Sequence, residues 1–450
     1  MGRGRGPPSG RRRRHRRGPR RAELGRRPAV TGENASIWQP RPYRLRGRIR
    51  NYHWGSRSLL AELRGEPPSA RPEAELWYGT HPGGPASIVD GERSAPLAAV
   101  ISARPDWWLG TGRGDRQLPF LIKLLAAATP LSIQVHPSVE QARRGFAREE
   151  ESGRPVTAPD RVYRDRSNKP EILRALSPFT ALYGFRPRAQ IGTALADLGL
   201  GDLLPGTTVR AQIERMVLLE GRARADFAAR VLEAASHQQT PARRWSKECR
   251  WIQQLAEHYP EDPWILAPLL LHLVELDRGE ALFTEAGVPH AYLEGLGVEL
   301  MNSSDNVIRA GLTSKPVDPH ELLRVVDSRK AVVVKRRSVP DSGSQASGGG
   351  AFRTFRTPAE EFELSELSVP GDDAMEIGVE TADRLELLLV ARGAFELRAD
   401  ADADADAAGR SVALGATDAA VVPAACARYR ITGSGLLFRA RTPLAVARSK

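Results

Sequence analysis

The chain has 450 residues, 41% of them hydrophobic and 27% charged, which is the balance of a globular protein with room for two or three domains. Its two cysteines, Cys249 and Cys426, exclude a disulfide framework and a cysteine-rich zinc site, and they favour a reducing, cytoplasmic compartment. No apolar run approaches the roughly 18 residues that a membrane-spanning helix needs, so no membrane partner is expected.

The net charge of +12 is concentrated at the N-terminus. Residues 1–30 contain twelve arginines and one acidic residue, Glu23, so this segment carries +11 and the remaining chain only +1. A segment rich in Arg, Gly and Pro cannot bury enough apolar surface to fold, and we expect residues 1–42 to form a disordered tail. Nucleic-acid binding through Arg11–Arg17 is one interpretation of the tail. We adopt a solvated extension instead and expect no nucleic-acid partner.

The body of the chain is predicted to be mainly β with a helical insert. Residues 43–186 contain short runs of strand-forming residues punctuated by Gly and Pro, such as Phe120–Leu125, and this pattern is typical of a sandwich or jelly roll. Between residues 187 and 278, apolar side chains recur at helical spacing. The apolar run Trp264–Val274 is interpreted as a buried helix within this insert.

The C-terminal part is predicted to return to β structure. Residues 279–337 complete the first β unit, residues 338–350, rich in Ser and Gly, form a linker, and residues 351–450 form a second β unit. Strands are expected at residues 281–283, 298–301, 332–334, 362–367, 385–391, 421–422 and 436–438.

The stretch 130–137, PLSIQVHP, combines an alternating apolar pattern with two polar side chains. On a strand, Gln134 and His136 share one face while Ile133 and Val135 occupy the other. An imidazole beside an amide in an apolar run is costly to bury without a partner. Two interpretations stay open: a core histidine satisfied by the glutamine, or half of a metal site.

A metal site needs further ligands from elsewhere in the chain, and with thiolates nearly absent these are carboxylates or histidines. Glu171 follows Lys169-Pro170 and begins an apolar run, and His290 follows Pro289, so prolines fix the approach to both. Two imidazoles, a carboxylate and an amide oxygen form a mixed N/O set that suits zinc. Spacing alone does not connect these residues, which lie far apart in the sequence.

Several further motifs are long and specific. They are YHWGS at 52–56, ELW at 75–77 followed by GTHP at 79–82, LPFL at 118–121, KPE at 169–171, and residues 289–318 with SDN at 304–306 and RAGLT at 309–313. In content and order they resemble motifs of the type I phosphomannose isomerases, and the resemblance runs from about Tyr43 to the C-terminus. It implies cupin-type jelly-roll domains with an α-helical domain, one Zn²⁺ per chain, and interconversion of mannose 6-phosphate and fructose 6-phosphate.

The resemblance also implies roles for individual residues. The implied zinc ligands are Gln134, His136, Glu171 and His290. The implied catalytic residues are Arg309, Glu299 and Lys169, and the implied substrate-binding residues are Ser132, Lys123, Lys315 and Trp54. The chain departs from the family pattern at Ser167-Asn168, Ser314 and Pro316, which puts the substrate preference in doubt but spares the ligands and Arg309.

The leading hypothesis is therefore a zinc-dependent aldose–ketose isomerase that passes through an enediol, binds a phosphorylated hexose and acts as a monomer. The general base is left open between Glu299 and a hydroxide on the metal, as is the fate of the product in GDP-mannose biosynthesis or in sugar catabolism. Two other hypotheses are kept: a non-catalytic cupin-type sugar-binding or regulatory protein, and a nucleic-acid-associated protein that acts through its tail.

Overall fold

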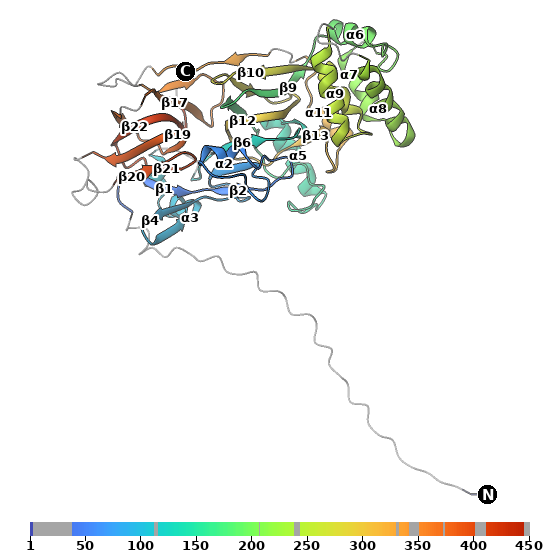
Figure 1. Ribbon diagram of the computed structural model, residues 1–450. Helices are drawn as coiled ribbons and strands as arrows, with labels where there is room; N and C mark the ends of the chain where they lie inside the picture. The colour runs from blue at the N-terminus through green and yellow to red at the C-terminus, as the bar shows by residue number, and fades with distance from the viewer. Residues whose placement is uncertain are drawn as a thin grey trace, which may run out of the picture.

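A computed structural model describes residues 1–2 and 38–444, apart from 112–115, 207, 238–243, 330–332, 342–350, 372–373 and 401–410. The chain is mainly β and forms two sheets, with most of the helices gathered at one end of the molecule (Figure 1). The predicted linker lies largely outside the described residues, and so does the predicted tail up to residue 37.

The first sheet is formed mostly by the C-terminal part of the chain. Its main strand order is β15-β16-β17-β22-β19-β21-β1-β4-β5, with β18 beside β22 and β20 beside β19. The strands are β1 (Tyr43–Arg46), β4 (Ser87–Asp90), β5 (Arg93–Pro96), β15 (Val339–Pro340), β16 (Arg353–Phe355), β17 (Glu363–Val369), β18 (Met375–Glu380), β19 (Glu386–Ala399), β20 (Ser411–Leu414), β21 (Ala419–Val422) and β22 (Arg428–Arg441).

The second sheet has the main order β14-β11-β8-β12-β6-β3-β2, and β7, β9, β10 and β13 pair alongside it. Its strands are β2 (Arg48–Arg50), β3 (Glu75–Gly79), β6 (Phe120–Ala127), β7 (Ile133–Val135), β8 (Glu171–Ala175), β9 (Phe179–Phe185), β10 (Leu271–Leu276), β11 (Ala281–Thr284), β12 (His290–Asn302), β13 (Ile308–Gly311) and β14 (Lys335–Arg336). Most of the strands predicted from the sequence are confirmed.

The long strand β12 connects the two halves of the second sheet. Its first residues pair with β7 and β9, and its later residues pair with β6 and β8. The strand bends at Gly295, whose φ of +127° is open to glycine and strained for other residues. A Cβ at Gly295 would lie 2.6 Å from the Phe179 ring, so glycine also permits the close approach of β9.

The two sheets share a hydrophobic core. Ile122 and Val298 of the second sheet belong to the same buried cluster as Leu387 and Phe438 of the first. Strand β1 pairs with β21 on one side and with β4 on the other, so three strands from the start of the chain complete the C-terminal sheet. Such long-range pairing is invisible in the order of the sequence, and the predicted domain boundaries do not describe it.

The ordered body begins before residue 43. Trp38 is buried and packs edge-on against Tyr43 at 5.1 Å, and the Arg41 guanidinium forms an ion pair with Asp90 at 2.7 Å. The prediction of disorder up to residue 42 is therefore wrong for these last residues. The buried Trp38 and the Arg41–Asp90 ion pair hold these residues against the folded body. The average composition of the tail does not reveal such individual contacts.

Several packed helices lie between β9 and β10, in the region predicted to form the helical insert. Ile213, Met216, Phe227, Val231 and Ile252, which carry the predicted helical spacing, are all buried in one cluster. The helices of the chain are α2 (Leu59–Leu63), α3 (Leu97–Ala103), α4 (Pro105–Leu109), α5 (Val139–Glu151), α6 (Arg188–Asp197), α7 (Val209–Val217), α8 (Gly221–Ser236), α9 (Ser246–His258), the 3₁₀ helix η1 (Pro263–Leu266), α10 (Ala267–Leu270) and α11 (Pro319–Val325).

Two sequence predictions about local structure are wrong. Trp264–Val274 is not one buried helix: it passes through η1 and α10 and then enters β10, which pairs with β9. A short apolar run has no periodicity that distinguishes a buried helix from a buried strand, because both bury every side chain. Val333 and Val334 lie outside a strand, since β14 begins only at Lys335, and Val332 lies outside the described residues.

In the described part of the chain, no helix combines the length and the apolar character needed to cross a membrane. Both cysteines are unpaired and buried. Burial raises the pKa of the Cys249 thiol to about 11 and that of Cys426 to about 12.

We expect neither thiol to react with a thiol reagent in the folded protein at mildly alkaline pH, because the thiolate is scarce and the sulfur is inaccessible. Titration with a chromogenic disulfide reagent should detect both thiols once denaturant is added. Rapid labelling of either cysteine in the folded protein would contradict the burial described.

Candidate functional site

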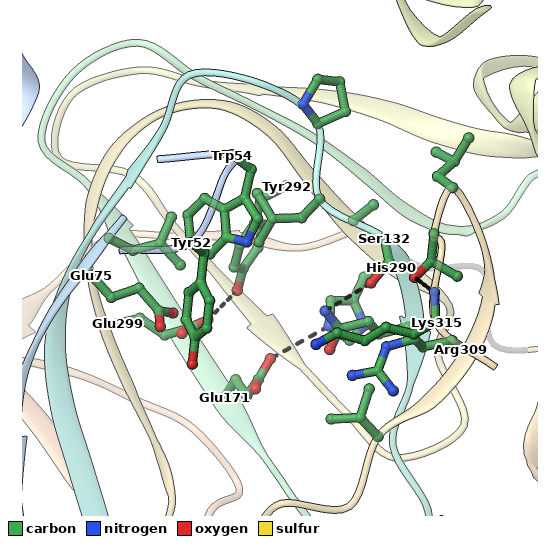
Figure 2. A pocket seen from close by; sticks show the side chains of 18 of the residues that line it. Tyr52, Trp54, Glu75, Ser132, Glu171, His290, Tyr292, Glu299, Arg309 and Lys315 are labelled. Carbon is green, nitrogen blue, oxygen red and sulfur yellow. Dashed lines mark hydrogen bonds and ion pairs between the residues drawn. The ribbon is translucent and has the colours of Figure 1, made fainter. Parts of the chain in front are cut away.

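One pocket on the second sheet, with a volume of about 270 Å³, collects almost all of the residues predicted to be functional. Figure 2 shows Glu75 and Glu299 on one side of it and Arg309 and Lys315 on the other. His136 is fully buried and does not line the pocket surface. The predicted residues that line the pocket are Trp54, Lys123, Ser132, Gln134, Lys169, Glu171, His290, Glu299, Arg309 and Lys315.

Three buried side chains, two of which line this pocket, form a candidate metal centre. His136 directly follows β7, Glu171 begins β8, and His290 begins β12, which pairs with both of those strands. Their ligand atoms lie within 4.8 Å of one another. Each histidine places its Nε2 3.4 Å from Oε2 of Glu171. The sheet thus brings together residues that are far apart in the sequence.

Hydrogen bonds to the backbone orient both imidazoles. Nδ1 of His136 lies 3.0 Å from the carbonyl oxygen of Asn306, and Nδ1 of His290 lies 3.2 Å from that of Val288. A carbonyl only accepts, so each Nδ1 donates and each Nε2 presents its lone pair to the centre. Nε2 of His136 is buried without a hydrogen-bond partner. A buried imidazole nitrogen without a hydrogen-bond partner, next to a carboxylate, is the arrangement expected of two zinc ligands.

Gln134 lies opposite both His290 and Arg309 in the strand register and lines the pocket. Its side-chain nitrogen contacts Oγ of Ser132 at 3.5 Å. The interpretation of a core histidine satisfied by this glutamine is wrong, because His136 bonds to the backbone of Asn306 instead. The role of Gln134 as a fourth ligand stays a prediction.

The electrostatics of the centre favour a charged Glu171 beside a neutral His136. Burial opposes ionisation of Glu171, but Lys169, whose Nζ lies 3.0 Å from Oε1, and the two histidines outweigh it and hold its pKa well below the usual value. Burial lowers the pKa of His136 to about 4, against the opposing attraction of Glu171. An anionic carboxylate and a neutral imidazole are the protonation states that zinc requires.

A second buried network of charges lies next to the metal centre. Lys123 of β6 stands directly opposite Glu299 of β12 and places its Nζ 2.5 Å from Oε2 of that glutamate. Glu75 of β3 accepts from the same Nζ at 2.8 Å. Tyr292 donates its hydroxyl to Oε1 of Glu299 at 2.7 Å. One cation and one hydroxyl thus hold both oxygens of Glu299 in place.

Burial raises the pKa of Glu299, and the nearby charge of Glu171 adds to the effect, although Lys123 opposes it. Burial by itself disfavours the ammonium of Lys123, but Glu299 and Glu75 reverse this and raise its pKa. The raised pKa of Lys123 keeps its ammonium protonated, so Lys123 orients Glu299 as a fixed ion-pair partner, while the raised pKa of Glu299 makes that carboxylate a stronger base.

The opposite side of the pocket is cationic. Arg309 lies on β13 and Lys315 follows shortly after that strand. Within the described residues, neither side chain forms an ion pair with a carboxylate. Burial lowers the pKa of both groups, and the positive charge of Arg164 adds to the effect. Unpaired cations that face a pocket are suited to bind an anionic ligand.

The comparisons with known proteins agree with this geometry. Residues 43–188 match the family model described as phosphomannose isomerase type I, catalytic domain. The chain is 38% identical to mannose-6-phosphate isomerase of Escherichia coli over 287 residues, which cover 61% of this chain and 72% of the relative. It is 35% identical to the mannose-6-phosphate isomerase of Salmonella typhimurium over 386 residues, which cover 83% of this chain and 94% of that relative. The chain belongs to the type I phosphomannose isomerase family.

Solved structures of this family have the same fold. The structure of mannose 6-phosphate isomerase from Salmonella typhimurium, described as bound to fructose 6-phosphate and zinc, matches with a TM-score of 0.77 at 30% identity. The match covers 90% of this chain and all of that one. The human mannose-6-phosphate isomerase is 31% identical over 389 residues, which cover 79% of this chain and 88% of the relative.

The departures from the family pattern lie close to the candidate site. Ser167 and Asn168 contribute backbone carbonyls, which accept from the side-chain amides of Asn306 and Asn302 at 2.8 and 2.9 Å. The contact at Ser167 does not depend on its side chain, whereas Oδ1 of Asn168 also lies 3.5 Å from Nδ2 of Asn302. Ser314 lines the pocket whereas Pro316 does not, so Ser314 is the departure that faces a ligand.

Glu75, Tyr292 and Asn306 were not predicted from the sequence. Lys123 lies inside an apolar strand, and a buried lysine needs a carboxylate partner. This requirement was a usable signal for Glu75. Tyr292 follows His290 by two residues on one strand, which places both on one face. Asn306 belongs to the SDN motif, but a motif does not reveal the role of a backbone carbonyl, and it is the Asn306 carbonyl that bonds to His136.

Replacing His290 with alanine removes one ligand of the candidate centre. We expect zinc affinity to fall by roughly 100-fold or more, because even loss of a residue that only orients a ligand costs 10–100-fold. Zinc content after dialysis against a competing chelator measures this. The exposed His320 on α11 offers the matched control, and His320→Ala should retain full zinc content. Equal zinc in both variants would remove His290 from the centre.

Proposed function

We propose that this chain is a zinc-dependent mannose-6-phosphate isomerase, which interconverts mannose 6-phosphate and fructose 6-phosphate. The observation that carries the proposal is the His136–Glu171–His290 centre, with its free Nε2, in the same pocket as the buried Lys123–Glu299 pair and the unpaired Arg309. The relatives named above are mannose-6-phosphate isomerases, and this chain covers most of their length.

We also propose the finer features of the family for this chain: cupin-type jelly-roll domains with a separate helical domain, and a monomer in the cytoplasm. The packed group of helices between β9 and β10 supports the helical domain. Two unpaired, buried cysteines are in keeping with a reducing compartment. The large hydrophobic side chains exposed in the described residues are few and scattered along the sequence, which favours a monomer.

Aldose–ketose isomerisation moves one proton between C1 and C2 and another between O1 and O2, through an enediol. We propose that Gln134, His136, Glu171 and His290 hold one Zn²⁺. When bound, the ion supplies positive charge that stabilises the oxyanion character developing on the substrate. The protein must supply the groups that take up and return the protons.

Glu299, held in place by Lys123, is our candidate base for the proton transfer at carbon. Burial raises the pKa of Glu299, which strengthens it as a base at neutral pH, and Tyr292 and Lys123 hold it in one orientation. Lys169, on the rim of the metal centre beside Glu171, is assigned proton transfer between the substrate oxygens. Trp54 and Ser132 line the same pocket and are assigned to substrate binding.

Arg309 and Lys315 are assigned to the anionic parts of the substrate. A guanidinium holds a phosphate or an oxyanion with two parallel hydrogen bonds, and Lys315 adds a second charge on the same side of the pocket. Because neither cation has a carboxylate partner within the described residues, binding a substrate anion breaks no internal ion pair.

Chelation tests the requirement for the metal. We expect the purified protein to convert mannose 6-phosphate to fructose 6-phosphate, to lose this activity when zinc is removed, and to regain it when zinc is restored. A coupled assay for fructose 6-phosphate measures the rate. A fully metallated sample without turnover would contradict the proposed function and favour the non-catalytic alternative.

Replacing Arg309 with alanine should leave the zinc content unchanged and lower kcat by roughly 100-fold or more, the usual cost of losing one group that stabilises charge in the transition state. Steady-state kinetics normalised to bound zinc measure this. Arg222, which is highly exposed on α8, provides the control variant Arg222→Ala. A normal kcat in Arg309→Ala would remove Arg309 from the mechanism.

A further inference from the structure

The turn between α9 and η1 brings the helical insert into contact with the cationic side of the pocket. Tyr259, immediately after α9, lines the pocket itself. Three residues later comes Asp262, a buried carboxylate that precedes η1. The mechanism proposed above uses neither residue, although both lie beside the segment that carries Arg309 and Lys315.

Asp262 connects three parts of the chain. Its Oδ1 accepts from the backbone N–H of Trp264 at 3.0 Å and so caps η1, and the same oxygen lies 3.1 Å from the Arg224 guanidinium of α8. Its other oxygen, Oδ2, accepts from the backbone N–H of Leu312 at 2.9 Å. The third contact leaves the helical insert and reaches the residue directly after β13.

Leu312 needs such a contact because its backbone is strained. Its φ of +53° is in the left-handed region, which a bulky residue rarely adopts, and its side chain is fully buried. Arg309 lies three residues before this point, and Lys315 lies three residues after it. The conformation of Leu312 therefore sets the direction in which the chain leaves β13 and places Thr313, Ser314 and Lys315 along the pocket.

Trp264 fixes the same segment from the other side. A Cβ added to Gly311 would lie 2.2 Å from Cδ1 of the Trp264 ring and 2.8 Å from its Cβ, so the tryptophan packs directly on the backbone at Gly311. The residue capped by Asp262 thus contacts Gly311, while Asp262 itself bonds to Leu312. Two adjacent backbone units between the two cations are held by one short turn.

We propose that Asp262 is a positioning residue for the reaction: its bond to Leu312 holds the segment 309–315 in the conformation that presents Arg309 and Lys315 to the substrate. The inference rests on the proposed function. It assigns the helical insert a direct part in substrate binding, in addition to its own packing. The competing explanation is that Asp262 only caps η1 and stabilises the insert.

Asp262→Ser separates these two explanations. A serine at the N-cap position, which Asp262 occupies, still caps the N–H two residues on, but its short side chain does not reach Leu312. A variant that is only less stable has unchanged kcat and KM in its folded fraction. We expect instead that kcat/KM for mannose 6-phosphate falls roughly 10- to 100-fold, with a higher KM and a lower kcat, because displacing positioned groups by about 1 Å costs this much.

Arg224→Ala is the matched control, because it removes a different partner of the same carboxylate and leaves the bond to Leu312 intact. We expect its kcat and KM to equal those of the unmodified protein. All rates are normalised to bound zinc, which Asp262→Ser should retain in full since its contacts lie outside the His136–Glu171–His290 centre.

The possible results separate the two proposals. If the unmodified, zinc-loaded protein does not turn over, the proposed function fails. If it turns over and Asp262→Ser has the same kcat and KM, the positioning role fails and Asp262 is only a cap. Should Asp262→Ser not fold, as judged by thermal melting, Asp262→Thr decides the question in the same way, because a threonine also caps η1 and its short side chain does not reach Leu312.

Discussion

The burial of ionised groups within the second sheet is the constraint on which this structure depends. Glu171 lies at the point where two imidazoles and the Lys169 ammonium converge, and each of these partners comes from a different segment. An unpaired buried carboxylate is strongly destabilising, so the geometry must be kept by the surrounding strands. The same requirement makes the centre suited to a divalent cation, which neutralises charge that the protein has already gathered.

The long strand β12 allows two chemical units to share one pocket. Its first residue, His290, belongs to the metal centre, while Glu299, further along the strand, faces Lys123. The bend at Gly295 lets one strand pair with β7 and β9 at its start and with β6 and β8 at its end. Because one backbone carries both groups, the distance between the metal ligand and the Glu299–Lys123 pair is fixed by the sheet.

The family resemblance extends beyond the metal ligands to the loops around them. The structure places the residues of these loops that differ from the family pattern. Ser167 and Asn168 both accept through their backbone carbonyls, and Asn168 also contacts Asn302 through its side-chain oxygen. Ser314 faces the pocket, in the segment whose start is held by Asp262 of the helical insert. Ser314 is therefore the departure placed to contact a ligand.

The sequence by itself indicated most of the strands, the helical spacing between β9 and β10 and, through motifs shared with a known family, the three residues that form the candidate metal centre, because periodicity and motifs are local properties. It did not determine that β1 completes the C-terminal sheet, that Trp264–Val274 ends in a strand, or that Trp38 is buried. Only tertiary structure decided these features, together with the partners of buried Lys123. Pairing between distant strands, and the burial it imposes on charged groups, depends on the whole fold and leaves no local pattern.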